Sequence, residues 1–332
     1  MSTAPIVRTH RDLSDCGLFC PFRVVCSFAV VMVLGPPSCL AQKMSRAERA
    51  IFHNGDDSRE NIVQNLTFKA SKKPHRIHQN LTIGEGAVLS VEAGTTFSCA
   101  PGIEIRLEGT INVIGDGYAI FQGVGGRGVT WKGFWIQPEY SATVKDLGIM
   151  GAETGIRVDD LSRLPGIENC VFEQCKRGIE LKRRDPAQQH VLRDVAFRNC
   201  GTGMIQNGGK TKFEHCSFDG CSSFGIHLAY AGQIELFYCL FKNGATAIQS
   251  ENHDASVRAE YCNFGRHRDH LFVVKTAAAW DCRNCYWQYN SVAELAASIV
   301  DGRDRGQLGI VDFSSPSAQP IASAGFEAPT PN

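Results

Sequence analysis

The chain carries no net charge, because Lys plus Arg and Asp plus Glu both number 34. Binding to nucleic acid or another polyanion through phosphates draws on an excess of basic residues, and no global field of that sign is present. A long apolar segment is also missing. The apolar run at residues 24–34 has 11 residues, whereas a membrane-spanning helix needs about 20. We therefore expect no nucleic-acid partner and no membrane span in the mature chain.

The N-terminal segment has the parts of a secretory signal. Arg8, Arg11 and Arg23 lie in a polar start, the apolar run follows, and the small residues Cys39 and Ala41 fit cleavage after Ala41. We predict a signal peptide over residues 1–41 and a secreted or periplasmic mature chain. An uncleaved anchor, or a true start codon further downstream, is the alternative.

Two residue columns recur through the chain with one period. The first is the aromatic of a Cys-x-Phe phrase, which returns after 25, 21, 23, 23 and 23 positions at Phe172, Phe197, Phe218, Phe241, Phe264 and Trp287. The second is a Gly-Ile pair or its variant, which begins at residues 133, 155, 178, 203, 225 and 247. A fixed period of this size indicates stacked repeats. Such repeats are too short for a strand plus a crossover helix, so each strand must pair with its equivalent in the next repeat.

This pairing predicts a parallel β-solenoid whose aromatic column stacks inside. The next outward position reads Glu173, Arg198, Asp219 and Lys242, which places opposite charges on neighbouring coils. Before the columns begin, short alternating runs between residues 81 and 121 are separated by glycines, a pattern typical of strands. They predict the first coils of the stack.

The same columns resemble a known family. Together with Leu89–Thr95, the closing Tyr286-Trp287 and the later Ile299–Gly302 and Val311–Phe313, they resemble right-handed parallel β-helix proteins of the pectin-lyase-like superfamily over residues 80–315. The resemblance implies an all-β, right-handed parallel β-helix of roughly nine to ten coils with short helical caps. It leaves function open, because this superfamily includes polysaccharide lyases, glycoside hydrolases, epimerases, adhesins and proteins with no known activity.

The predicted organisation has five parts. A cap segment at residues 42–79 follows the signal peptide, and the β-helix covers residues 80–289. A C-terminal helix with its core at residues 292–300 and a closing strand at residues 310–313 fill residues 290–315. The Ser, Ala and Pro-rich end, residues 316–332, is predicted to be disordered.

Ten of the 14 cysteines remain after removal of the leader, and seven of them form two further columns. These are Cys216, Cys239, Cys262 and Cys285, and Cys175, Cys200 and Cys221. Side chains in parallel register point the same way, which suits disulfide geometry poorly, whereas an inward thiol is a small apolar filler. We predict packed free thiols, with disulfides as the alternative that export would permit. We expect no metal site. Asn65 and Asn80 begin glycosylation sequons, whose use the sequence leaves open.

Polar residues that follow the Gly-Ile column are the candidate functional residues. Strand alternation places on one outer face Arg157, Asp159, Glu180, Lys182, His227, Gln249 and Glu251, with Tyr230 nearby. We predict a secreted, non-catalytic scaffold that binds a polysaccharide or a cell-surface partner, without a cofactor, through Arg157, His227, Tyr230, Gln249 and Glu251. The simpler interpretation is that mixed charges only keep the outside of a solenoid soluble.

An enzyme is the alternative function. A polysaccharide lyase of this superfamily uses acidic groups to hold calcium and a base to remove a proton, and Asp159, Asp160, Glu180 and Lys182 supply those residue types. A related hydrolase needs two separated carboxylates, such as Asp159 with Glu180 or Asp160 with Asp185. The enzyme signatures of the family are missing from the sequence, which favours the non-catalytic scaffold.

Two tryptophans flank the start of the Gly-Ile column. Strict alternation puts Trp131 and Trp135 on one face, on either side of Gly133-Phe134. Facing outward they would form a stacking platform for sugar rings. Facing inward they would join the core, which is the expectation for at least one of them.

Overall fold

The computed structural model describes residues 60–62, 65–124, 130–136, 144–159, 166–182, 189–251 and 254–328. The predicted signal peptide, the first part of the predicted cap, Asp160 and Asp185 lie outside these ranges. The described residues belong to one compact unit, Met44–Asn332. In this part of the chain no helix is both long and apolar enough to cross a membrane.

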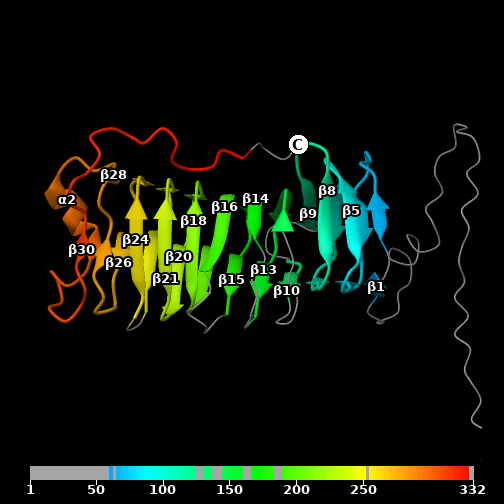
Figure 1. Cartoon of the computed structure of the whole chain (residues 1–332), viewed down its shortest axis with the longest axis horizontal. Coiled ribbons are helices and arrows are strands. Elements are labelled where there is room, and N and C mark those ends of the chain that lie inside the picture. Colours follow the sequence, from blue (N-terminus) through cyan, green and yellow to red (C-terminus); the bar gives the residue numbers. More distant parts are fainter. Residues whose placement is uncertain are drawn as a thin grey trace, which may run out of the picture. The chain divides into compact units, whose positions relative to one another are not determined.

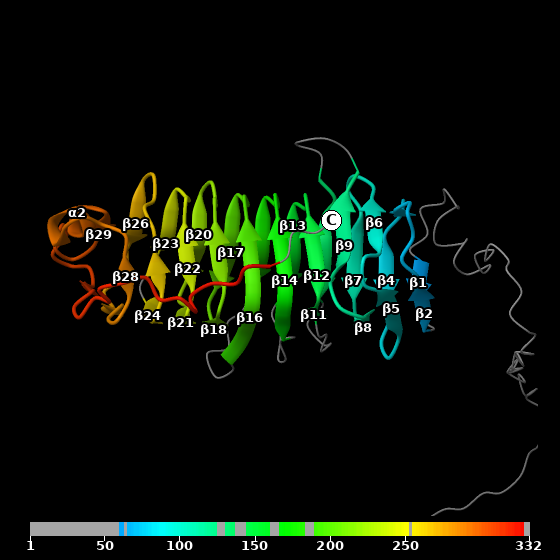
Figure 2. The same cartoon turned by 90° about the horizontal axis from the view of Figure 1, so that it is seen from above.

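Parallel strands wind into a solenoid of about nine turns (Figures 1 and 2). One long sheet has 11 strands, in the order β1 (Glu60–Ile62), β4 (Leu81–Ile83), β7 (Glu104–Leu107), β10 (Gly133–Ile136), β13 (Thr154–Val158), β15 (Arg177–Leu181), β17 (Thr202–Asn207), β20 (Phe224–Tyr230), β23 (Thr246–Ser250), β26 (His270–Val273) and β29 (Ile299–Val300). We call it the eleven-stranded sheet. Each strand pairs in parallel with its equivalent in the next coil, as Ile156 pairs with Ile179.

A second long sheet forms the other wall. Its main path is β3 (His75–Ile77), β6 (Thr96–Cys99), β9 (Ala119–Gly123), β12 (Leu147–Met150), β14 (Ile167–Glu173), β16 (Gln189–Arg198), β18 (Lys210–Glu214), β21 (Gln233–Phe237), β24 (Ser256–Glu260), β27 (Trp280–Asp281) and β30 (Val311–Asp312). Joined to this sixteen-stranded sheet are β11 (Val144–Lys145), β19 (Ser217–Asp219), β22 (Leu240–Lys242), β25 (Asn263–Phe264) and β28 (Tyr286–Trp287). A small sheet contains β2 (Leu66–Phe68), β5 (Val88–Glu92) and β8 (Thr110–Ile114). The predicted fold class is confirmed.

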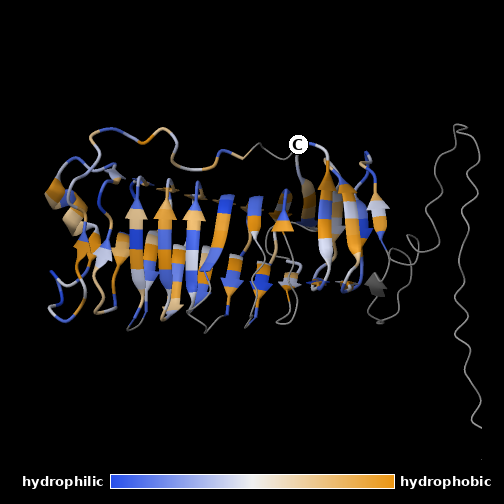
Figure 3. Cartoon of the chain, viewed as in Figure 1, coloured by the Kyte–Doolittle hydropathy of each residue, from blue (hydrophilic) through white to orange (hydrophobic). Residues whose placement is uncertain are grey.

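The aromatic column fills the interior as predicted. Consecutive rings from Phe172 to Trp287 stack with centroids 4.5 to 5.2 Å apart. Along the strands, hydrophobic and hydrophilic residues alternate (Figure 3). The outward charges also pair in register, since Glu173 lies opposite Arg198 and Lys242 reaches Asp219 at 3.4 Å. Core and surface therefore specify the same register.

The glycine column has no side chain because the aromatic column occupies that space. A Cβ at Gly203 would lie 2.6 Å from the Gly225 carbonyl oxygen and 2.7 Å from Cδ1 of Phe218. The same overlap occurs at Gly155, Gly178 and Gly225, each against the ring of its own coil. The two columns keep one period because a ring of one sheet packs on the bare backbone of the other.

The cysteine columns are buried free thiols, as the packing interpretation expects. In the first column each thiol donates to a main-chain carbonyl of the preceding coil, with Sγ to O distances of 3.5 Å for Cys216, 3.7 Å for Cys239, 3.5 Å for Cys262 and 3.4 Å for Cys285. A cysteine therefore fills the corner of a coil and satisfies a carbonyl that approaches it. Within the described ranges no group of three or more His, Cys, Asp or Glu is placed to hold a metal ion.

The ends of the stack differ from the prediction in two places. Strands β1, β2 and β3 belong to the first coil and not to a cap, since β1 pairs with β4 and β3 with β6. The segment lacks the repeat columns, so the pattern gave no sign of it. At the other end, α2 spans Val292–Ala297 and is shorter than predicted, because Ile299 is buried in β29 beside β26. Burial of Ile299 against the neighbouring strand stabilises the chain more than another helical turn would.

Both sequon asparagines have a structural role in these first coils. The Asn65 side-chain oxygen accepts from the Val88 amide at 3.0 Å, and the Asn80 oxygen accepts from the Glu104 amide at 2.9 Å. Each bond satisfies a main-chain donor of the next coil.

The prediction of a disordered tail is corrected for residues 316–328. This segment, red in Figure 2, runs back across the strands on the outside of the sixteen-stranded sheet. Its main chain bonds to the side chains of Asn263 and Ser217. The composition is too polar and too small to build a core of its own. The sheet supplies the hydrogen-bond partners that the tail lacks.

We predict that Gly203→Ala destabilises the protein by about 1 to 3 kcal/mol, because the added methyl overlaps backbone and ring atoms that cannot both move. Urea unfolding followed by circular dichroism measures the change. Gly166→Ala is the matched control, since a Cβ there meets nothing within 4 Å. Equal unfolding midpoints for the two variants would contradict the packing of ring on glycine.

We also predict that the thiols are unreactive in the folded protein. Burial raises the pKa of Cys170 and of Cys221 to about 12, from an ordinary value of 9.0. Since the folded pKa is the higher one, the stability from these protonated thiols is complete below pH 9 and is lost as the pH rises toward 12. A thiol reagent followed by peptide mapping should label no cysteine between residues 99 and 285 in native protein, and all ten after unfolding without reductant. Fewer free thiols after unfolding would favour disulfides.

Candidate functional site

The predicted site residues lie along the outer face of the eleven-stranded sheet. Arg157 is paired with Glu180, and His227 is paired with Gln249, while Ile205 occupies the coil between the two pairs. Asp159, Lys182, Tyr230 and Glu251 follow at or just beyond the ends of the same strands. The shared face that alternation predicted is confirmed. The roles assigned to these residues stay predictions.

The first polar group on this face surrounds Trp135. Its indole lies between the guanidinium groups of Arg106 and Arg157, each 4.4 Å from the ring centroid. The indole Nε1 donates to Oδ2 of Asp159 at 2.8 Å. Trp135 is in register with both arginines, so cation–π contacts hold the indole between the side chains of the two neighbouring coils.

The carboxylates of this group are already ion-paired. Asp159 lies 3.5 Å from Arg157 and 3.6 Å from Lys182. Glu180, whose side chain is 11% exposed, lies 3.2 Å from Arg177 and 4.0 Å from Lys182. The sheet thus brings together three of the four predicted catalytic residues, and Asp160 lies outside the described residues. Glu180 and Lys182 line a hollow of about 270 Å³, and Asp159 is held at its edge by the Trp135 indole and Lys182.

A second polar group contains three of the predicted ligand-binding residues. His227 Nε2 lies 3.2 Å from Glu251, which also accepts from Lys275 at 2.9 Å and from Gln249. Burial raises the pKa of Glu251, but the bonds from Lys275, Gln249 and His227 outweigh it and hold the pKa below its usual value. The Phe224 ring stacks on His227 with centroids 4.8 Å apart. The Glu251 carboxylate is thus shared by three donors of the protein, from His227, Gln249 and Lys275.

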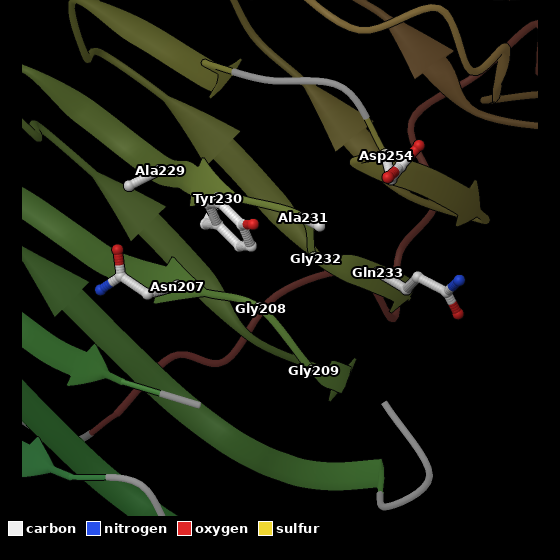
Figure 4. Close-up of a pocket in the computed structure, with 9 residues that line it drawn as sticks. All are labelled: Asn207, Gly208, Gly209, Ala229, Tyr230, Ala231, Gly232, Gln233 and Asp254. Atoms are coloured by element: carbon white, nitrogen blue, oxygen red, sulfur yellow. The ribbon is translucent and has the colours of Figure 1, made fainter. Parts of the chain in front are cut away.

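A hollow lies beside Tyr230, where β17 and β20 end (Figure 4). Its volume is about 760 Å³, and Tyr230 is 60% exposed. Strand β20 carries one extra residue, Ala229, relative to β17, so that Asn207 pairs with Tyr230 and not with Ala229. The bulge turns the Tyr230 ring outward, where regular alternation would have placed it inside.

The floor of the Tyr230 hollow is bare backbone. Gly208 and Gly209 have φ of 96° and 75° and form the turn after β17. Beneath them the buried Gln206 donates from Nε2 to the Gly209 carbonyl at 2.9 Å. This bond holds the turn from the inside. Ala231 and Gly232 form the equivalent turn one coil later.

Polar side chains form the rim of the hollow. Asn207, Gln233 and Asp254 lie around the Tyr230 ring (Figure 4). Such a site offers an aromatic face for an apolar surface and amide and carboxylate groups for hydroxyls. Sequence reasoning named Tyr230 but missed its turns. The available signal was the recurrence of small residues after Asn207 and after Tyr230, 23 positions apart.

The two tryptophans do not form a platform. Trp131 is fully buried and donates from Nε1 to the Met150 carbonyl at 3.0 Å, whereas Trp135 lies on the outer face. Alternation failed because Gly133 adopts φ of 101° between them, where a Cβ would fall 1.7 Å from the Thr154 oxygen. The expectation that at least one is core is confirmed.

Comparison with known proteins bears on the fold. The family model of the right-handed β-helix region matches residues 132–291, which include strands β10 to β28 and both repeat columns. The fold-level resemblance stated from the sequence is confirmed. Searches of the curated proteins and of the solved structures found no match.

Proposed function

This chain is a right-handed parallel β-helix protein, and we propose that it is a secreted or periplasmic, non-catalytic scaffold that binds neutral carbohydrate on the outer face of the eleven-stranded sheet. The observation that carries the proposal is the exposed Tyr230 ring beside a hollow with a glycine floor and a polar rim. The export signal expected at residues 1–41 supports the location.

The Tyr230 hollow fits the chemistry of a sugar ring. One face of a hexose presents C–H groups, which stack on an aromatic ring, while its edge presents hydroxyls that need donors and acceptors. Asn207 and Gln233 offer both kinds, and Asp254 accepts. The bare backbone floor lets a flat ring approach closely because no Cβ projects from Gly208 or Gly209.

The charge of the rim favours a neutral sugar over a uronate. Among the described residues that line the hollow, Asp254 is the charged one and none is basic. A uronate carboxylate bound there would face Asp254 without a cation between them, and like charges at close range repel. A neutral sugar has no such cost.

The rest of the outer face can bind further sugar units of the same polymer without taking part in a reaction. Neighbouring coils lie about 4.8 Å apart, so a polymer along the sheet meets a new coil at each step. On that path Asp159, Glu180 and Glu251 are each bonded to cations of the protein itself. These ion-paired carboxylates can accept hydrogen bonds from sugar hydroxyls, and the ion pairs restrain their side chains.

The alternative is a polysaccharide lyase or related carbohydrate-active enzyme. The observation in its favour is that Lys182 contacts both Asp159 and Glu180, while Glu180 and Lys182 line a hollow of about 270 Å³. Acidic oxygens of this kind suit calcium, the cofactor expected for that alternative.

We predict that Tyr230→Ala weakens binding to a neutral polysaccharide by about tenfold, because the aromatic face that the sugar covers is removed. Affinity electrophoresis through gels that contain xylan, galactan or a glucan, and in parallel polygalacturonate or alginate, measures the retardation. Tyr230→Phe should bind like the parent. Tyr261→Ala is the matched control, because Tyr261 is also exposed, at 43%, but lies on another corner of the coil.

The same polymers separate the two functions. Equal retardation of the parent and Tyr230→Ala in every gel would refute binding at this hollow. Release of unsaturated or reducing ends, with or without calcium, that is lost in Asp159→Ala or Lys182→Ala would establish the enzyme in place of the scaffold.

A further inference from the structure

The residue between Cys and Phe of each phrase faces outward in an unbroken column on the sixteen-stranded sheet. The register from β12 to β28 gives this middle column as Gly148, Val171, Ala196, Ser217, Leu240, Asn263 and Tyr286. Val171 and Ala196 are nevertheless buried. The C-terminal tail covers this column (Figure 2).

Two side chains of the column bond the tail through its main chain alone. Asn263 accepts from the Ile321 amide and donates to the Ile321 carbonyl, both at 2.9 Å. Ser217 accepts from the Phe326 amide at 2.6 Å and donates to the Phe326 carbonyl at 3.0 Å. Paired bonds of this kind imitate strand pairing, so they recognise an extended peptide whatever its side chains.

Sequence selectivity comes from close approach between these two bonds. Gly325 has φ of 96°, and its amide donates to the Tyr238 carbonyl at 2.7 Å. A Cβ at Gly325 would lie 2.7 Å from Cβ of Leu240 and 2.9 Å from Oγ of Ser217. We call the surface that the tail covers, made of the middle column with Tyr238 and Arg198, the groove. The groove therefore requires glycine at position 325 of the bound segment.

The residues after Gly325 pack into a small apolar cluster on the outside of the sheet. Ala328 is buried with Val171 and Ala196, and Phe326 packs against the same cluster. The Arg198 guanidinium donates to the Ala328 carbonyl at 2.5 Å. A segment with Gly, Phe and Ala at these positions meets a matching contact at each one.

The contacts between the tail and the groove are separate from the hydrophobic core. The main buried cluster runs from Phe68 to Val311 and contains no residue of the tail, whereas Ala328 belongs to a small second cluster on the outside. The residues that lead into the tail, Ser314 to Pro316, are exposed. The hydrophobic core of the coils is therefore complete without the tail, which packs on the outer surface of the sheet as a bound peptide would.

We propose that this groove is a peptide-recognition site that the C-terminal tail occupies in cis and that the same segment of a second copy of this chain occupies in trans once the cis tail is released. A tethered segment has an effective concentration near millimolar, which excludes the trans tail while the tether is intact. Cutting or displacing the tail removes that advantage and opens the groove to a neighbour.

The test uses full-length protein with a specific protease site inserted between Ser315 and Pro316. After the cut, the tail fragment should co-elute with the body in gel filtration, and a fluorescent peptide of residues 316–328, which stands for the tail of a second copy, should replace it. A peptide with Gly325→Ala should bind at least tenfold more weakly, because its methyl overlaps Leu240 and Ser217. The Ala322→Ser peptide is the matched control, since Ala322 is exposed.

A second variant tests whether the labelled peptide binds in the groove. Asn263→Ala in the cut protein should weaken the labelled peptide about tenfold, because both bonds to Ile321 are lost. Circular dichroism of each cut protein reports whether the body remains folded. Unfolding of the body after the cut would show that the tail is an integral part of the fold and would overturn the proposal. A folded body that does not bind the peptide, or binds the Gly325→Ala peptide equally well, would overturn it too.

Discussion

The contact between an aromatic ring of one sheet and a bare glycine backbone of the other is the constraint on which this structure depends. At Phe218 and Gly203 the fit leaves no room for a methyl group. The contact recurs in four successive coils, at Gly155, Gly178, Gly203 and Gly225, so it sets the distance between the two long sheets there and keeps their periods equal. Close-packed interiors tolerate little change in volume. Each coil therefore fixes the register of the next.

This packing decides where function can lie. Rings, thiols and aliphatic side chains occupy the inward positions, and burial puts the cysteines out of reach of solvent. The outward positions are left, and the two long sheets use them differently. The eleven-stranded sheet presents compensated charges and the Tyr230 hollow. The sixteen-stranded sheet presents small and polar side chains that bind the tail. One face offers an open hollow, while the other already holds a peptide.

The repeat period made most of the fold predictable from the sequence, because equal spacing of two columns permits only stacked coils. Alternation also predicted the face shared by Arg157 and Glu180. It failed where backbone leaves the regular strand, at Gly133 between the tryptophans and at the bulge before Tyr230. The first coil lacks the columns, and the tail depends on contacts more than 50 residues away, as between Asn263 and Ile321. The positions of the first coil and of the tail both depend on pairing with residues elsewhere in the chain, so the local sequence pattern did not predict them.

The most direct test of the central claim, that recognition occurs at the outer face of the eleven-stranded sheet, is amide hydrogen exchange with and without a bound neutral oligosaccharide. We expect slower exchange at residues 207–209 and 229–233, which line the Tyr230 hollow. Exchange in the rest of the sixteen-stranded sheet, apart from Gln233 at the start of β21 and including residues 210–219, should stay unchanged. Protection confined to the sixteen-stranded sheet, or centred on residues 154–159 and 177–182 around Trp135, would contradict it.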